Sequence, residues 1–148
     1  MRKISDIMNK NLVVINKETG LDEIIKIMKT NRIGKIPVID ANGEVLGVVT
    51  RDDILVREEK LPMQPMIAFW EVLISLPTSK EFQDKIKKMS SYKAGDLFSN
   101  NYYIATSNDN LEDVITEMLD NKYEYTLIIE NKKLVGIVTK SDLIDKCF

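Results

Sequence analysis

A seven-residue pattern occurs twice in this chain and limits the folds that the chain can adopt. The copies read Gly47-Val48-Val49-Thr50-Arg51-Asp52-Asp53 and Gly136-Ile137-Val138-Thr139-Lys140-Ser141-Asp142. Each copy is a short apolar strand that runs directly into a helix, with a hydroxyl at the junction and a carboxylate three residues later. Two copies of one strand–helix unit indicate a fold built by duplication.

The duplication extends over most of the 148 residues. Residues 4–8 align with residues 94–98, and residues 21–28 align with residues 111–118, both at an offset of 90 (94 − 4 and 111 − 21). The glycines of the two motifs are 89 apart (136 − 47), because the second copy is one residue shorter. The missing residue falls in a predicted hairpin turn, where the chain tolerates a deletion most easily.

Each copy gives the same order of predicted elements. Apolar residues at helical spacing predict one helix from Leu21 and another from Leu111, with inner faces formed by Leu21, Ile24, Ile25 and Met28 and by Leu111, Val114, Ile115 and Met118. Strands are predicted over 12–15, 36–39 and 45–49, and over 102–105, 127–129 and 134–138. Asn42-Gly43 predicts a hairpin turn, and the last helices start at Thr50 and Thr139.

The predicted fold is therefore α/β (α+β), with two β-α-β-β-α repeats that each follow a short helical turn. A repeat of about 55 residues is marginal alone. We expect the two repeats to pack sheet to sheet with pseudo-two-fold symmetry. The predicted domains are residues 1–60 (first repeat), 61–92 (helical insertion) and 93–148 (second repeat).

Composition argues against several classes of function. The formal net charge of −2 does not favour a nucleic-acid partner, because such proteins usually carry a basic face. The chain has no histidine and a single cysteine, Cys147, so the common metal sites and histidine-based nucleophiles are not expected. We expect no signal peptide, and the sequence has no apolar run of membrane-spanning length. We expect a cytoplasmic protein that is not an enzyme and has no membrane partner.

These motifs resemble a tandem pair of CBS domains, also called a Bateman module. The resemblance rests on Asp6-Ile7-Met8, the helix from Leu21, residues 36–40, Gly43-x-x-x-Gly47 and the two Gly-x-x-Thr-x-x-Asp motifs. It implies a regulatory sensor that binds adenosine-containing ligands, such as AMP, ADP or ATP, in clefts between the repeats. It also implies signalling through conformation or dimer geometry, a homodimer, and a partner protein of unknown identity. No cofactor is required.

The resemblance implies that Thr50 and Asp53 contact a ligand, and that Thr139 and Asp142 do so in the second repeat. The residues themselves agree, because a helix N-terminus attracts phosphate and a carboxylate accepts hydrogen bonds from a ribose diol. Thr-x-x-Asp is also close to a capping box, which needs no ligand. Both interpretations stay open, and they are compatible with each other.

Further candidates surround these pairs. Arg51 and Lys140 place a cation in the first helical turn, where the helix dipole disfavours it; each is either a phosphate contact or an ordinary solvated side chain. The resemblance also implies an adenine slot, and as sequence these residues are equally well explained as core. The slot residues are Val14, Ile36 and Pro37 in the first repeat, and Ile104, Thr126 and Leu127 in the second.

The two predicted sites differ in sequence. Leu127 replaces Pro37, and the second copy carries Glu124, a negative charge near the expected phosphate position. Three outcomes stay open for the second site: weaker binding, a different ligand, or no ligand.

The insertion matches neither repeat. Residues 66–76 lie between Pro65 and Pro77 and predict an apolar helix that contains Trp70. A second helix follows, with Phe82, Ile86 and Met89 on one face. The hairpin either packs on its own module, forms a dimer contact, or covers a ligand cleft. An alternative function follows, in which the protein is a ligand-independent interaction or dimerisation module that uses the Trp70 helix.

Overall fold

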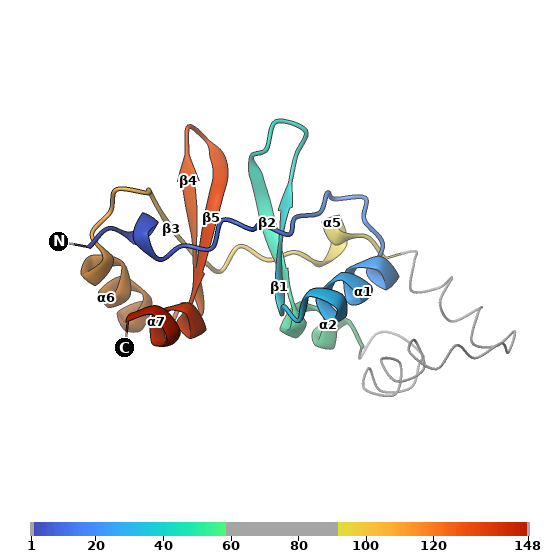
Figure 1. Cartoon of the computed structure of the whole chain (residues 1–148). Coiled ribbons are helices and arrows are strands. Elements are labelled where there is room, and N and C mark those ends of the chain that lie inside the picture. The colour runs from blue at the N-terminus through green and yellow to red at the C-terminus, as the bar shows by residue number, and fades with distance from the viewer. Residues whose placement is uncertain (1, 59–91, 148) are drawn as a thin grey trace, which may run out of the picture. The chain divides into compact units, whose positions relative to one another are not determined.

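A computed structural model of the chain describes residues 2–58 and 92–147. The fold is mixed α+β, with two small sheets and helices around them (Figure 1). In chain order the elements are η1 (Ile4–Asp6), α1 (Leu21–Asn31), β1 (Lys35–Ile39), β2 (Val45–Thr50), α2 (Arg51–Glu58), α5 (Ala94–Leu97), β3 (Tyr103–Ala105), α6 (Leu111–Asn121), β4 (Tyr125–Glu130), β5 (Lys133–Thr139) and α7 (Lys140–Cys147).

The described residues form two compact units. The α1 unit consists of residues 14–40 with the described part of 46–99, and the α6 unit consists of residues 2–13, 41–45 and 100–147. Each unit contains one sheet and one copy of the strand–helix motif.

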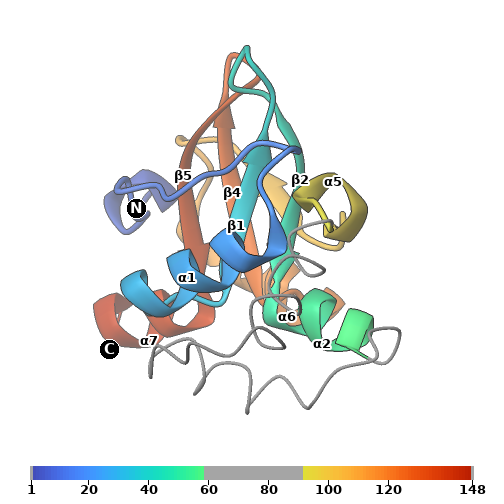
Figure 2. The ribbon, with the colours of Figure 1, turned by 90° about the vertical axis from the view of Figure 1, so that its right-hand side faces the viewer.

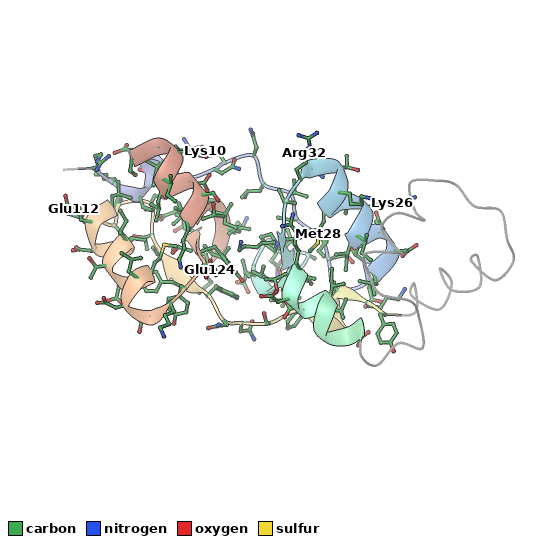
Figure 3. The ribbon with its side chains drawn as sticks, turned by 90° about the horizontal axis from the view of Figure 1, so that it is seen from below. Lys10, Lys26, Met28, Arg32, Glu112 and Glu124 are labelled. Carbon is green, nitrogen blue, oxygen red and sulfur yellow. The ribbon has the colours of Figure 1, made fainter. Side chains whose placement is uncertain are left out.

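The α1 unit packs α1 against the two-stranded β1–β2 sheet. The helix follows Gly20 and ends at Arg32, which adopts a left-handed conformation with φ of 53° and closes the last turn. Its predicted inner face is confirmed, because Leu21, Ile24, Ile25 and Met28 are all buried. Met28 points into this core, whereas Lys26 is exposed on the outside of the helix (Figure 3). Figure 2 shows α1 and α2 on the unit that contains β1 and β2.

The α6 unit contains a three-stranded sheet in the order β3-β4-β5. β3 runs parallel to β4, and β5 runs antiparallel to it. Asn131 and Lys132, with φ of 51° and 69°, form the tight turn between β4 and β5. The side chain of Asn110 caps α6 by accepting a hydrogen bond from the Glu112 N–H at 2.7 Å. Buried residues of α6, β4 and β5 pack in one core: Leu111, Val114, Met118, Ile128 and Val138.

The short helical turn that begins each repeat belongs to the unit built from the other repeat. η1 places Ile4 and Ile7 in the core of the α6 unit, and the Ile4 N–H donates to the Asp109 carbonyl at 2.9 Å. In the same way, α5 places Ala94 and Leu97 in the core of the α1 unit. The units thus exchange their first segments, while the sequence boundaries at 60/61 and 92/93 stay a prediction.

Most predicted elements are confirmed, with one exception. The strand predicted over 12–15 is reduced to a single parallel bridge between Ile15 and Val38. Its backbone makes two hydrogen bonds there, from Ile15 N–H to the Pro37 carbonyl at 3.0 Å and from Ile39 N–H to the Ile15 carbonyl at 2.9 Å. The first sheet therefore has two strands where the second has three.

Two other expectations are not tested. The predicted helices of the insertion, including Trp70, lie in residues 59–91, outside the described residues. The packing of the two sheets on each other stays a prediction. In the part of the chain that is described, no helix has the length and apolar character to cross a bilayer.

Candidate functional site: the heads of α2 and α7

The strand-to-helix junction has the same hydrogen bonds in both units. In the α1 unit, Oδ2 of Asp53 accepts from the Thr50 N–H at 2.8 Å and from its hydroxyl at 3.0 Å. The Asp53 N–H in turn donates to the Thr50 hydroxyl at 3.2 Å. This reciprocal arrangement is a capping box. The capping interpretation of Thr-x-x-Asp therefore has a structural basis in the α1 unit.

The α6 unit repeats this geometry within a tenth of an ångström. Asp142 Oδ2 lies 2.9 Å from the Thr139 nitrogen and 3.1 Å from its hydroxyl oxygen, and the Asp142 N–H donates to that hydroxyl at 3.2 Å. All four side chains are half-buried rather than covered. Each pair therefore braces its helix and still reaches the surface.

The cap leaves one backbone donor at each helix head. The capping box uses the N–H groups of Thr50 and Asp53, and the Gly34 carbonyl accepts from the Arg51 N–H at 3.0 Å. Within residues 2–58 and 92–147, no acceptor is found for the N–H of Asp52, or for that of Ser141 at the second head. An N–H at a helix N-terminus carries partial positive charge and suits an anionic or polar ligand atom.

The residue across from each head differs between the units. Position 124 corresponds to position 34, because the Glu124 carbonyl accepts from the Lys140 N–H at 3.3 Å. The Nζ of Lys140 lies 3.4 Å from Oε1 of Glu124. In the α1 unit the Arg51 side chain instead lies against Gly34, where an added Cβ would be 3.1 Å from its Nε.

The two motif glycines are close-packing positions. A Cβ on Gly47 would lie 2.5 Å from a ring carbon of Phe98, and one on Gly136 would lie 2.5 Å from the sulfur of Met8. The neighbour in each case is the side chain that follows the exchanged helical turn, so these glycines receive the segment from the other repeat.

The residues of the implied adenine slot divide between the two faces of each sheet. Ile36 is fully buried in the core beneath α1, so Pro37, which follows it in β1, projects to the opposite face. In the second sheet, Ile104 pairs with Leu127 and Leu127 pairs with Ile137. Thr139 lies two residues beyond Ile137, so the structure brings Ile104, Leu127 and Thr139 to one face.

Exposure also separates these residues. Ile104 is 51% exposed, Leu127 is fully buried, and Val14 is half-buried. Thr126 lies on the helix side of β4, because it pairs with Val138 of the α6-unit core. Its hydroxyl is buried, and no hydrogen-bond partner for it is found among the described residues.

Sequence reasoning missed one residue at the first head. The hydroxyl of Ser99 donates to Oδ2 of Asp53 at 3.3 Å. No local pattern links two residues that far apart in sequence.

The expected absence of metal ligands concerns the whole chain. Among the described residues, no group of three or more Cys, Asp or Glu side chains could hold a metal ion.

Known proteins match this chain along most of its length. The family model described as CBS domain matches it twice, over residues 4–59 and 94–148. An uncharacterized protein of Methanocaldococcus jannaschii is 25% identical over 150 residues, covering 96% of this chain and 89% of that protein. The chloroplastic CBS domain-containing protein CBSX2 of Arabidopsis thaliana is 26% identical over 138 residues, covering 91% of this chain and 58% of that protein.

Solved structures have the same fold. The crystal structure of CBSX2 in complex with AMP has a TM-score of 0.73 at 23% identity, covering 99% of this chain and 96% of that one. The CBS domain pair of protein MJ0100, in complex with 5-methylthioadenosine and S-adenosyl-L-methionine, has a TM-score of 0.68 at 18% identity, covering 98% and 94%. At these identities the likeness shows the fold.

Proposed function

The chain belongs to the CBS domain family, and from this membership we propose that it is a regulatory protein that binds adenosine-containing ligands at the heads of α2 and α7. The observation that carries the proposal is the pair of equivalent Thr–Asp caps, each half-buried beside a cation in the first helical turn. A purely mechanical cap does not need the cation, which the helix dipole disfavours in the first turn.

Each group at the helix head has a role in this proposal. The carboxylates of Asp53 and Asp142 accept hydrogen bonds from ribose hydroxyls. The open N–H groups of Asp52 and Ser141 donate to polar ligand atoms, and the threonine hydroxyls do so once a ligand displaces them from the aspartates. A ligand that takes over the aspartate then competes with the cap, so occupancy and the hydrogen bonding of the helix are coupled.

The apolar slot residues complete the proposed site. We assign the adenine to the sheet face that carries Ile104 and Leu127 in the α6 unit, and to Pro37 with Val14 in the α1 unit. Ile36 supports this face from the core on the other side of β1. Two similar structures support the ligand class, because one holds AMP and the other holds 5-methylthioadenosine and S-adenosyl-L-methionine as ligands of those proteins.

The proposal is one of binding and regulation, with no reaction assigned to these residues. We further propose that the protein is a cytoplasmic homodimer and that a partner protein reads the ligand-bound state. The alternative of a ligand-independent module depends on the Trp70 helix, outside the described residues.

Thermal unfolding with AMP, ATP and S-adenosylmethionine tests the proposal. A ligand at 100 times its dissociation constant should add about 2.7 kcal/mol to the free energy of unfolding. Asp53→Asn and Asp142→Asn should each reduce this gain, measured against the same variant without ligand. Asp120→Asn, which changes an exposed carboxylate on α6, is the matched control and should keep the gain. A protein that responds to none of the three ligands would contradict the proposal.

A further inference from the structure

The residue across from the helix head differs in charge between the two units. Gly34 and Glu124 are equivalent, because each carbonyl accepts from the first N–H of its helix, at 3.0 Å from Arg51 and at 3.3 Å from Lys140. Neither position has a positive φ. The difference between them is therefore the Glu124 carboxylate itself, which Figure 3 labels beside the α6 unit's helices.

This carboxylate pairs with the cation of its own helix head. The Lys140 ammonium lies 3.4 Å from Oε1 of Glu124, and the two side chains are 40% and 66% exposed. Arg51 has no ion pair within the described residues. Asp52 occupies the position that Ser141 has in α7. It is exposed, and it makes no ion pair with Arg51 in the described structure. The cation of the α2 head therefore stays available to a ligand, and the cation of the α7 head is occupied.

We propose that Glu124 is a specificity-determining residue, so that the α7 head takes adenosine compounds without a phosphate and the α2 head takes phosphorylated ones. This inference rests on the proposed function. A phosphate at the α7 head has to displace Glu124 from Lys140 and is repelled by the freed carboxylate. An unphosphorylated nucleoside needs only the capping aspartate and the open backbone N–H, and both heads have these two groups.

Two exchanges of the residue across the head test this inference. Gly34→Glu brings the ion pair into the α1 unit, and it can fit because the three atoms nearest the new Cβ, at 3.1–3.2 Å, belong to the flexible end of the Arg51 side chain. Glu124→Gln removes the charge from the α6 unit and keeps the size. Glu112→Gln makes the same charge change on an exposed position of α6, separated from Glu124 in Figure 3, and serves as the control.

The probes are AMP and adenosine, which differ only in the phosphate. Calorimetric titration at low salt, where exposed charges are least screened, gives the ratio of the two affinities. We expect Gly34→Glu to weaken AMP about fivefold relative to adenosine, and Glu124→Gln to strengthen AMP by a similar factor at a second site per chain, since exposed ion pairs contribute up to about that much. Glu112→Gln should keep the wild-type ratio.

The possible outcomes distinguish a failure of the inference about Glu124 from a failure of the proposed function. If both exchanges keep the wild-type ratio of AMP to adenosine affinity, the inference is overturned and the proposed function stands. If the wild-type protein binds neither probe and no other adenosine compound, the proposed function fails and the inference falls with it. If circular dichroism shows that Gly34→Glu is unfolded, Glu124→Gln decides alone, because Glu124 is exposed.

Discussion

The hydroxyl of Ser99 donates a hydrogen bond to Oδ2 of Asp53 at 3.3 Å, although 46 positions separate the two residues. The backbone of Ser99 also pairs with Val48, with N–O distances of 2.9 and 3.0 Å. The corresponding residue of the other repeat, Asn9, uses its side chain locally to accept from the Asn11 N–H. The α2 cap therefore has one more hydrogen bond than the α7 cap, and it is tied to the exchanged segment.

Loss of this hydroxyl should destabilise the protein. Ser99→Ala removes one donor from the half-buried Asp53 carboxylate, so we expect the free energy of unfolding to fall by about 1 kcal/mol. Urea denaturation measures the change. Ser141→Ala, at an exposed position of α7, should stay within about 0.5 kcal/mol of the wild type. Equal effects of the two substitutions would contradict the role of Ser99.

Alanine at the motif glycines should be costly, and more so at Gly47 than at Gly136. An added methyl group meets the rigid ring of Phe98 at Gly47 but the flexible side chain of Met8 at Gly136. We expect about 2–3 kcal/mol for Gly47→Ala and about 1 kcal/mol for Gly136→Ala, by urea denaturation. In a double-mutant cycle, Phe98→Ala should recover part of the cost of Gly47→Ala. Strict additivity would show that the two residues do not interfere.

Removal of the Thr126 hydroxyl should stabilise the α6 unit. This hydroxyl is buried without a hydrogen-bond partner among the described residues, and the equivalent residue of the first repeat is the apolar Ile36. We expect Thr126→Val to raise the free energy of unfolding by about 1 kcal/mol. Thr116→Val is the control, because it removes a hydroxyl that does donate, to the Glu112 carbonyl at 2.9 Å. A destabilised Thr126→Val variant would mean that the hydroxyl has a partner in solution.

The exchanged turns predict that two equivalent substitutions act on opposite units. Ile7 is buried in the core of the α6 unit, and Leu97 is buried in the core of the α1 unit. Truncation to alanine should cost about 2–5 kcal/mol in each case. Amide hydrogen exchange should show the loss of protection in α6 for Ile7→Ala and in α1 for Leu97→Ala. Loss in the helix of the same repeat would contradict the exchange.

Stability above pH 10 should depend on Tyr103. Burial, followed by the nearby carboxylates of Glu117, Asp109 and Asp113, raises the pKa of Tyr103 above its usual value of 10.0. The folded state thus favours the neutral phenol, and the resulting stabilisation is complete below pH 10 and is lost as the pH rises through the folded pKa. We expect the wild type to lose more stability than Tyr103→Phe as the pH rises above about 10. If the free energy of unfolding depends on pH in the same way for the two proteins, this prediction is contradicted.

Local periodicity was sufficient to predict most elements of the fold. The apolar spacing of Leu21, Ile24, Ile25 and Met28 marks the buried face of α1, because a helix packed on a sheet needs one continuous apolar stripe. The strand predicted over residues 12–15 was wrong, because only Ile15 of this segment pairs with β1. Alternating apolar residues indicate that a segment can form a strand. Whether it does depends on a hydrogen-bonding partner strand that lies elsewhere in the sequence.

Within the candidate site, the sequence predicted the Thr–Asp capping pairs but not the contacts made by residues from the other repeat. Thr50 with Asp53, and Thr139 with Asp142, are linked by spacing alone, and their hydrogen bonds follow from that spacing. The partnership of Ser99 with Asp53 and the packing of Phe98 on Gly47 depend on the exchange of segments between repeats. A local pattern cannot predict which repeat the short helical turn packs against, because the packing surfaces of the two repeats have similar sequences.

The exchange of helical turns has a consequence for a chain cut once between residues 58 and 92. The N-terminal fragment would carry η1, which the α6 unit requires, and the C-terminal fragment would carry α5, which the α1 unit requires. Neither piece can then complete a core from its own residues. Such fragments should be unfolded apart and regain structure only on mixing, so that a nicked molecule still behaves as one protein.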